Sequence, residues 1–156
     1  MNQNQTKVLG LDVGDKRIGV ASYCSADQTI VPVNTVSRAQ GRAEAFLLEL
    51  LSKDRFDLII AGTPLSGNNQ ETEQCDSVHQ FCRRLAKRCD IKIEFQDEYL
   101  SSEEAKELLR IRGEPEKGVR ESGVIDAVSA AVILQRYLAR TGHPIAIRLR
   151  YRGKSL

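Results

Sequence analysis

The residues best suited to do chemistry are acids that lie far apart in the sequence: Asp12, one member of the pair Asp97-Glu98, and Asp126. Carboxylate oxygens are the ligands that hard divalent cations such as Mg²⁺ prefer. Two such cations, about 4 Å apart, can activate a water molecule and stabilise the leaving oxygen in phosphodiester hydrolysis. If these acids meet in the fold, the sequence predicts a metal-dependent phosphodiesterase.

Asp12 lies near the end of a short apolar run, Val8–Val13, which stops at Gly14-Asp15 and is followed by Ile18–Ala21. This pattern predicts a strand, a tight turn and a second strand. Alternation along the first strand places Val8, Gly10 and Asp12 on one face, and Leu9, Leu11 and Val13 on the other. A carboxylate among apolar neighbours is costly unless a positive group meets it.

The other acids also lie where ligands are commonly bound. Asp97-Glu98 directly follow the predicted strand Ile91–Phe95, and the carboxyl ends of strands form the binding crevice of open α/β sheets. Asp126 lies in Gly123–Leu134, which is almost entirely apolar or small and predicts a buried helix. The helix dipole stabilises a first-turn carboxylate by about 0.3–1 kcal/mol, less than the several kcal/mol that burying an ion costs. Asp126 therefore needs a cationic partner, such as a metal ion, or a solvated opening.

Each acid also has a simpler explanation when it is considered alone. Asp12 could support the hairpin turn, Glu98 could be a surface residue, and Asp126 could merely favour the start of a helix. Spacing alone leaves these alternatives open, because the acids are distant in sequence.

The elements that must position the acids follow from hydrophobic periodicity. Pro32 indicates that the third strand is an edge strand or carries a bulge. The segments predicted as strands are 8–13, 18–21, 29–36, 57–61 and 91–95, and those predicted as helices are 40–53, 71–88, 101–110 and 122–141. Three opening strands followed by alternating helices and strands predict an α/β fold, a mixed sheet with helices on its faces. We expect residues 1–156 to form a single domain that ends in a basic tail, about 142–156.

Charge is distributed unevenly along the chain. The net charge is only +2, yet all 21 acids lie at or before Asp126. The charged residues beyond it are all basic: Arg136, Arg140, Arg148, Arg150, Arg152 and Lys154. A basic C-terminal segment suits a polyanion such as nucleic acid, although a solvated tail explains it equally well. Since no apolar run approaches a membrane span and no signal peptide is apparent, we expect a cytoplasmic protein with no membrane partner.

Four segments together resemble the YqgF family, the RuvC-like pre-16S rRNA nucleases of the ribonuclease H-like superfamily, which are also similar to Holliday junction resolvases. They are LGLDVGDKRIGVA (9–21), IIAGTPLSGN (59–68), DEYLSSEEA (97–105) and IDAVSAAVILQRYL (125–138). The resemblance implies a ribonuclease H-like fold with a five-stranded mixed sheet in the order β-β-β-α-β-α-β-α. It also implies that Asp12, Glu98 and Asp126 are the catalytic and metal-binding residues. The implied activity is 5′-end maturation of pre-16S ribosomal RNA by Mg²⁺- or Mn²⁺-dependent hydrolysis, with association with ribosomal particles.

The sequence departs from the family pattern at two places. Tyr99 stands where the family commonly has an arginine, and Asn68-Asn69 stand where an acid often follows the glycine. Both changes affect expected substrate contacts more than metal binding. Tyr99 could stack on a base, but aromatic residues make up only 5% of the chain, which argues against a platform for single strands. Recognition of the backbone and shape of structured RNA is the better expectation.

Residues expected to contact nucleic acid lie around the predicted acidic site. Lys16 and Arg17 follow Asp12 at the hairpin turn and could neutralise a phosphate, although a solvated turn is an equally good explanation. The loop 62–69 precedes a helix N-terminus, a position that favours anions. The expected nucleic-acid-binding residues are Lys16, Arg17, Thr63, Ser66, Asn68, Ser101, Lys117 and Arg120.

Three other functions remain open at this stage. A Holliday junction resolvase-like DNA nuclease would use the same acids on branched DNA. A non-catalytic RNA-binding factor in ribosome assembly would use the same cleft without cleavage. The D-x-G segment at Asp12 also resembles the phosphate loop of actin-like ATPases, but those folds enclose ATP between two domains and this chain has the length of one.

Overall fold

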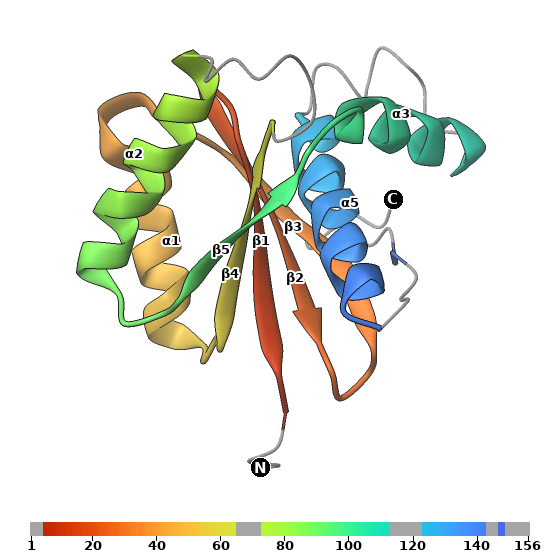
Figure 1. The fold of residues 1–156 in the computed structure, drawn as a ribbon, viewed down its shortest axis with the longest axis horizontal. Coiled ribbons are helices and arrows are strands. Elements are labelled where there is room, and N and C mark those ends of the chain that lie inside the picture. The colour runs from red at the N-terminus through yellow and green to blue at the C-terminus, as the bar shows by residue number, and fades with distance from the viewer. Residues whose placement is uncertain (1–4, 65–72, 113–122, 143–146, 149–156) are drawn as a thin grey trace.

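The computed structural model describes residues 5–64, 73–112, 123–142 and 147–148. Its centre is a five-stranded sheet in the order β3-β2-β1-β4-β5 (Figure 1). The strands are β1 (Lys7–Val13), β2 (Arg17–Cys24), β3 (Thr29–Ser37), β4 (Leu58–Thr63) and β5 (Ile93–Asp97). The first three pair antiparallel, whereas β4 pairs parallel with both β1 and β5. The predicted mixed α/β sheet is therefore confirmed.

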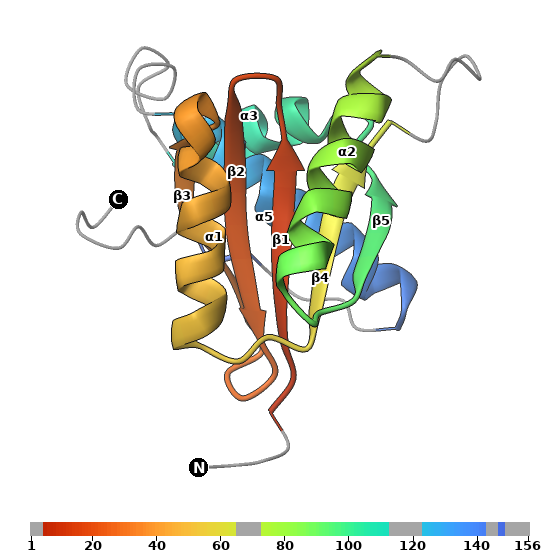
Figure 2. The same ribbon diagram turned by 90° about the vertical axis from the view of Figure 1, so that its left-hand side faces the viewer.

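Helices cover both faces of this sheet. They are α1 (Arg42–Lys53), α2 (Glu73–Arg88), α3 (Ser101–Arg112) and α5 (Val124–Arg140), with a short 3₁₀ turn, η1 (Ala39–Gly41), before α1. Helices α1 and α2 lie side by side on one face, and α5 crosses the other face with α3 beside its first turns (Figures 1 and 2). No described helix is long and apolar enough to cross a membrane.

Alternation along β1 divides the core between the two faces, as predicted. Leu9, Leu11 and Val13 are buried in the cluster beneath α1 and α2, whereas Val8 belongs to the cluster beneath α5. Gly10 shares the face of Val8, and a Cβ there would overlap the side chain of Leu134 on α5. Because α5 approaches the sheet so closely, Asp12, two residues farther along the same face, points toward the start of that helix.

Element boundaries differ slightly from those predicted. Strand β3 is an edge strand, and its pairing with β2 shifts register between Val20 and Ala21, opposite Pro32, so both predictions for this proline are confirmed. Helix α5 has Gly123 as its N-cap, with φ of 69°, and Ser122, the first residue of the predicted helix, lies outside the described residues. Helix α3 extends to Arg112, two residues beyond its predicted end.

Candidate active site

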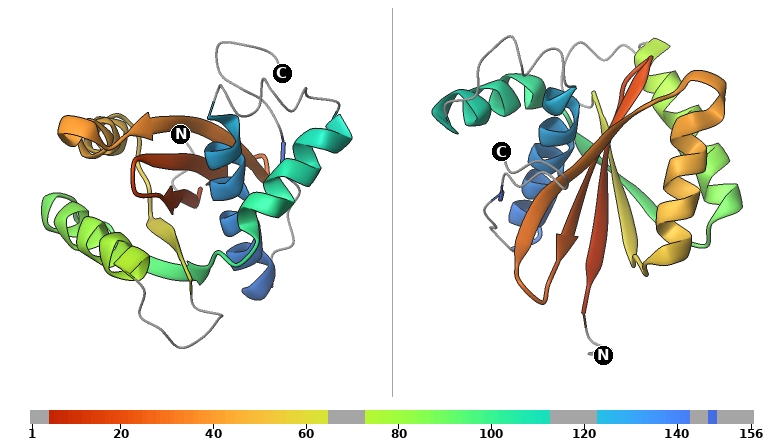
Figure 3. Two further views of the ribbon diagram at one scale, coloured as in Figure 1. Left: turned by 90° about the horizontal axis from the view of Figure 1, so that it is seen from above. Right: turned by 180° about the vertical axis from the view of Figure 1, so that it is seen from behind.

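One edge of the sheet gathers the ends of the elements that carry the three acids. Strands β1, β4 and β5 are parallel, so their carboxyl ends lie at the same edge. Helix α5 begins at that edge, and α3 lies beside the first turns of α5 and extends away from the sheet (Figures 1 and 3). Asp12 is the penultimate residue of β1, Glu98 directly follows β5, and Asp126 lies in the first turn of α5.

The carboxyl groups of Asp12 and Glu98 lie close enough together for a hydrogen bond between them to contribute to the pKa of each. Burial, together with the negative charges of Glu98 and Asp126, raises the pKa of Asp12 from 3.8 to about 8. Burial also raises the pKa of Glu98, while its hydrogen bond with Asp12 lowers it. Asp12 is thus the protonated member near neutral pH and donates to the Glu98 carboxylate. Two acids from opposite parts of the chain form one titrating unit, with Asp126 close enough to act on it electrostatically.

The backbone around Glu98 selects this acid, rather than Asp97, to face Asp12. The Glu98 N–H donates to the Thr63 carbonyl at 3.1 Å, and the Ser101 N–H donates to the Glu98 carbonyl at 2.9 Å. Gly62 makes room for the side chain, since a Cβ there would lie 3.0 Å from Glu98 Oε2 and would also overlap Ile133. The Asp97 carboxylate instead accepts from the Tyr99 N–H at 3.1 Å.

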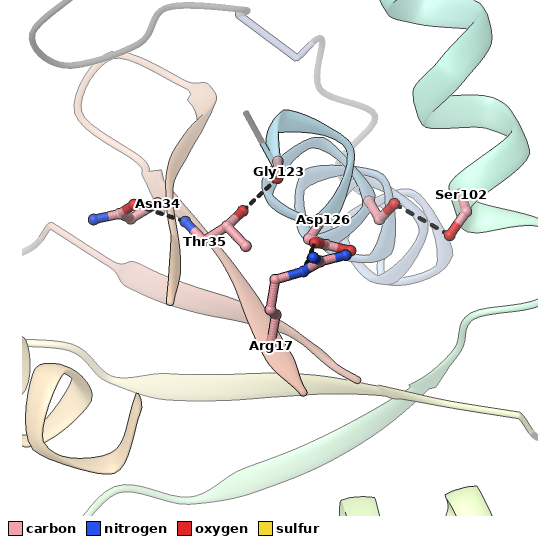
Figure 4. Close-up of polar contacts among 7 residues, drawn as sticks. Arg17, Asn34, Thr35, Ser102, Gly123 and Asp126 are labelled. Carbon is pink, nitrogen blue, oxygen red and sulfur yellow. Dashed lines mark hydrogen bonds and ion pairs between the residues drawn. The ribbon is translucent and has the colours of Figure 1, made fainter. Parts of the chain in front are cut away.

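Asp126 is brought to the site by very close packing of α5 on β2. A Cβ on Gly19 would overlap the carbonyl oxygen of Asp126, so only glycine permits this approach. Arg17 Nε donates to Asp126 Oδ2 at 3.0 Å (Figure 4). Asp126 thus has Arg17 as a cationic partner and also some access to solvent, the two alternatives that the sequence left open.

Further hydrogen bonds hold the first turns of α5 in place. Thr35 Oγ1 donates to the Gly123 carbonyl at 2.6 Å, which ties β3 to the residue before the helix. The buried Ser129 donates to Ser102 on α3 at 3.5 Å, a long contact (Figure 4). These contacts position Asp126 from both sides of the helix.

Two arginines that support the site were missed by the sequence reasoning. Arg38 donates to the Gly14 carbonyl at 2.7 Å and through its backbone N–H to the Lys16 carbonyl at 2.8 Å, so it braces the turn after Asp12. Arg136 on α5 donates to the Asp97 carbonyl at 3.2 Å and to Glu104 at 2.7 Å, so it joins α5 to the segment that carries Glu98. Arg136 appeared in the sequence only as one of several C-terminal basic residues, and nothing local distinguished Arg38.

The structure places the expected nucleic-acid-binding residues in different settings. Lys16 and Arg17 are exposed beside the acids, as a phosphate contact would require. Thr63 and Ser101 are buried, 0% and 4% exposed, which does not suit direct contact with nucleic acid, and their backbones hold Glu98 instead. Four further residues lie outside the described part of the chain: Ser66, Asn68, Lys117 and Arg120.

The donor chemistry of the site fits a hard divalent cation. Asp12, Glu98 and Asp126 offer only carboxylate oxygens, the donors that Mg²⁺ and Mn²⁺ prefer. Among the described residues, no group of three aspartate, glutamate, histidine or cysteine side chains is close enough together to hold a metal ion. Asp126 is instead paired with Arg17. A cation would nevertheless relieve the repulsion from Glu98 and Asp126 that helps to raise the pKa of Asp12.

The sheet order, the covering helices and the acidic edge together define a ribonuclease H-like α/β fold. The RuvC nuclease of Thermus thermophilus, solved with a Holliday junction substrate, superimposes with a TM-score of 0.52 at 17% identity, over 90% of this chain and 98% of that one. A second Thermus thermophilus RuvC structure gives the same TM-score. The comparison confirms the expected fold.

Sequence comparison then defines the family. The model of the family described as "RuvX: Holliday junction resolvase" matches residues 6–140. A Synechococcus elongatus protein named "Putative pre-16S rRNA nuclease" is 33% identical over 87% of this chain and 91% of its own length. A protein of the same name from Syntrophus aciditrophicus is 37% identical over 85% and 87%. The chain belongs to the RuvX family, a family of nucleases, which are hydrolases of phosphodiester bonds.

Proposed function

We propose that the protein is a metal-dependent nuclease in which Asp12, Glu98 and Asp126 form the catalytic and metal-binding site. The observation that supports this most directly is the proximity of the three acids, since the charges of Glu98 and Asp126 both raise the pKa of Asp12. Acids that serve only as surface or turn residues have no reason to gather at a partly buried position, because repulsion and loss of hydration make this costly. Perturbed carboxylates of this kind are typical of functional sites.

The three acids would hold Mg²⁺ or Mn²⁺, which supplies Lewis-acid activation of water and charge neutralisation at the scissile phosphate. Asp12 must release its proton to solvent before it can act as a ligand beside the Glu98 carboxylate. Arg17 and Lys16, exposed at the hairpin turn, would bind the phosphate backbone beside the acids. Arg136 and Arg38 would maintain the geometry without touching substrate.

The proposed substrate is the precursor of 16S ribosomal RNA, cleaved in the maturation of its 5′ end. The names of the curated relatives support it, since proteins 33% and 37% identical to this chain are called pre-16S rRNA nucleases. Such a substrate implies action in the cytoplasm and association with ribosomal particles. The exposed basic residues beside the acids suit a structured polyanion.

Cleavage of a labelled 5′ fragment of pre-16S ribosomal RNA by the purified full chain tests this function. We expect cleavage with Mn²⁺ or Mg²⁺, none with a chelator, and at least a hundredfold loss in Asp12→Asn, Glu98→Gln and Asp126→Asn. Asp15→Asn is the matched control, because Asp15 is an exposed acid in the same hairpin and outside the site. Full activity in all three site variants, at wild-type folding, would refute the assignment.

A DNA junction nuclease is the second candidate, supported by the description of the family model and by the fold shared with RuvC. A mobile four-way DNA junction, placed in the same assay, distinguishes the two substrates. Preferential cleavage of the junction by the wild type, abolished by the same three substitutions, would favour the resolvase. If neither substrate is cleaved but the RNA is bound, the non-catalytic assembly factor would replace the nuclease.

A further inference from the structure

The turn between β5 and α3 exposes two large apolar side chains next to Glu98. Tyr99 is 58% exposed and Leu100 53% exposed. The described residues contain one other exposed large hydrophobic side chain, Ile111, which lies at the far end of α3. Apolar exposure is therefore concentrated at the rim of the acidic site.

This turn is held by hydrogen bonds on each side of the apolar pair. The Tyr99 N–H donates to Asp97 Oδ1 at 3.1 Å, and the Glu104 N–H donates to the Leu100 carbonyl at 3.0 Å. Arg136 fixes the Asp97 carbonyl from α5. The backbone that carries the two side chains is thus held in place, which lowers the conformational entropy that binding would cost.

Leu100 adopts the left-handed backbone conformation, with φ of 57°. Leucine is disfavoured there because its Cβ approaches the carbonyl oxygen, whereas glycine adopts it freely. Strained residues of this kind persist where the surrounding contacts hold the backbone in place, and they are common at ligand-binding sites and active sites. Because the side chain of Leu100 is exposed, it does not contribute to the core. The strain at this residue therefore indicates a role in binding rather than in stabilising the fold.

We propose that Tyr99 and Leu100 form a seat for one unpaired base next to the scissile phosphate, with the tyrosine ring stacked on that base. This rests on the proposed function, because the base is placed by the proximity of Tyr99 to Glu98. Tyr99 directly follows Glu98 in the chain and its side chain is exposed, so a base stacked on its ring would lie beside the nucleotide held at the acids.

The chemistry of the pair favours a base over a protein partner. A protein docked on Tyr99 and Leu100 would cover Glu98 and close the acidic edge to any substrate. An aromatic face accepts every base without sequence preference, and a single tyrosine limits the contact to one nucleotide. The specificity that results is for an unpaired nucleotide at the cleavage point rather than for a sequence.

Binding of two RNA probes by the full chain, with Ca²⁺ to occupy oxygen ligands, tests the seat independently of cleavage. One probe is a blunt duplex, and the other carries a short unpaired extension with 2-aminopurine at successive positions. The variants are Tyr99→Ala, Tyr99→Phe, Leu100→Gly and, as a matched control, Ile111→Ala, which removes another exposed apolar side chain from the far end of α3.

For the extended probe we expect Tyr99→Ala to weaken affinity about tenfold, within the range for loss of a stacking aromatic, and to abolish quenching of 2-aminopurine at one position. Tyr99→Phe and Ile111→Ala should stay within twofold of wild type, and the blunt duplex should not distinguish the variants. Leu100→Gly should weaken binding severalfold while its melting temperature stays the same or rises, since glycine relieves the left-handed strain.

Equal affinities of wild type and Tyr99→Ala for the extended probe, or equal losses on both probes, would overturn the seat. Cleavage by wild type together with such a result would leave the proposed nuclease intact. Tyr99-dependent binding without metal-dependent cleavage would retain the seat and refute the nuclease.

Discussion

Arg17 Nε lies 3.0 Å from Asp126 Oδ2 and joins residues that are 109 positions apart in the chain. Arg17 begins β2 and is 60% exposed, whereas Asp126 lies in the first turn of α5 and is 27% exposed. An exposed ion pair of this kind adds at most about 1 kcal/mol to stability. Its larger effect is functional, because the arginine neutralises a carboxylate that the proposed metal site needs.

Arg17→Gln is therefore expected to bind Mn²⁺ severalfold more tightly than wild type in the absence of nucleic acid, because a competing cation is removed. The same variant should bind RNA more weakly, since it loses a phosphate contact. Isothermal titration with Mn²⁺ measures the first effect, and fluorescence anisotropy with RNA measures the second. Lys16→Gln makes the same change in net charge at a neighbouring exposed position and should alter Mn²⁺ affinity by less than twofold. Weaker Mn²⁺ binding by Arg17→Gln would contradict competition between Arg17 and the cation for Asp126.

Asp12→Asn is expected to stabilise the metal-free protein at pH 8 but not at pH 4. The folded-state pKa of Asp12, about 8, exceeds its ordinary value of 3.8. Between these values the folded protein keeps a proton that the unfolded chain has released, so the free energy of unfolding falls as pH rises. Asparagine lacks this titration, so the melting temperature should exceed that of wild type by several degrees at pH 8. Thermal melts at both pH values, with Asp15→Asn as control, measure the difference, and equal melting temperatures at pH 8 would exclude the raised pKa.

Mn²⁺ affinity is expected to rise between pH 6 and pH 8 and to level off above. The cation must displace the proton of Asp12 throughout this range, which limits the change to about tenfold per pH unit. Titrations in buffers of different ionisation enthalpy report the number of protons released. Asp12→Asn should bind weakly with little dependence on pH, and a wild-type affinity independent of pH would argue against Asp12 as a ligand.

Gly19→Ala is expected to destabilise the protein by about 3 kcal/mol, near the upper range for overpacking, because its Cβ would overlap the Asp126 carbonyl. Gly41→Ala is the comparison, since nothing lies within 4 Å of a Cβ there and only its φ of 71° opposes the change, at about 1 kcal/mol. Urea denaturation measures both free energies of unfolding. Equal losses in the two variants would show that α5 does not depend on close approach at Gly19.

Much of the fold could be predicted because the relevant signals are local. Alternation in β1, the bulge opposite Pro32 and the apolar helix around Asp126 all follow from short-range sequence patterns. The choice of Glu98 over Asp97 depended on the family resemblance. The structure shows the physical basis of that choice in the hydrogen bonds at Thr63 and Ser101.

The contacts that complete the site were not predictable in this way. The partner of Asp126 depends on how α5 sits over β2, and the bracing arginines Arg38 and Arg136 act across 24 and 39 positions. The burial of Thr63 and Ser101 likewise depends on packing rather than on their residue types. Leu100 carries no sequence signal for a left-handed turn, because leucine is not a residue that favours it.

The packing of α5 against Gly19 also has a consequence for synthesis. Chains grow from the N-terminus, so Asp12 and Glu98 are synthesised before Asp126. A nascent chain that lacks α5 carries two of the three proposed ligands and none of the helix that covers Gly10 and Gly19. We therefore expect the proposed site to be completed only after α5 has been synthesised and has packed against β2.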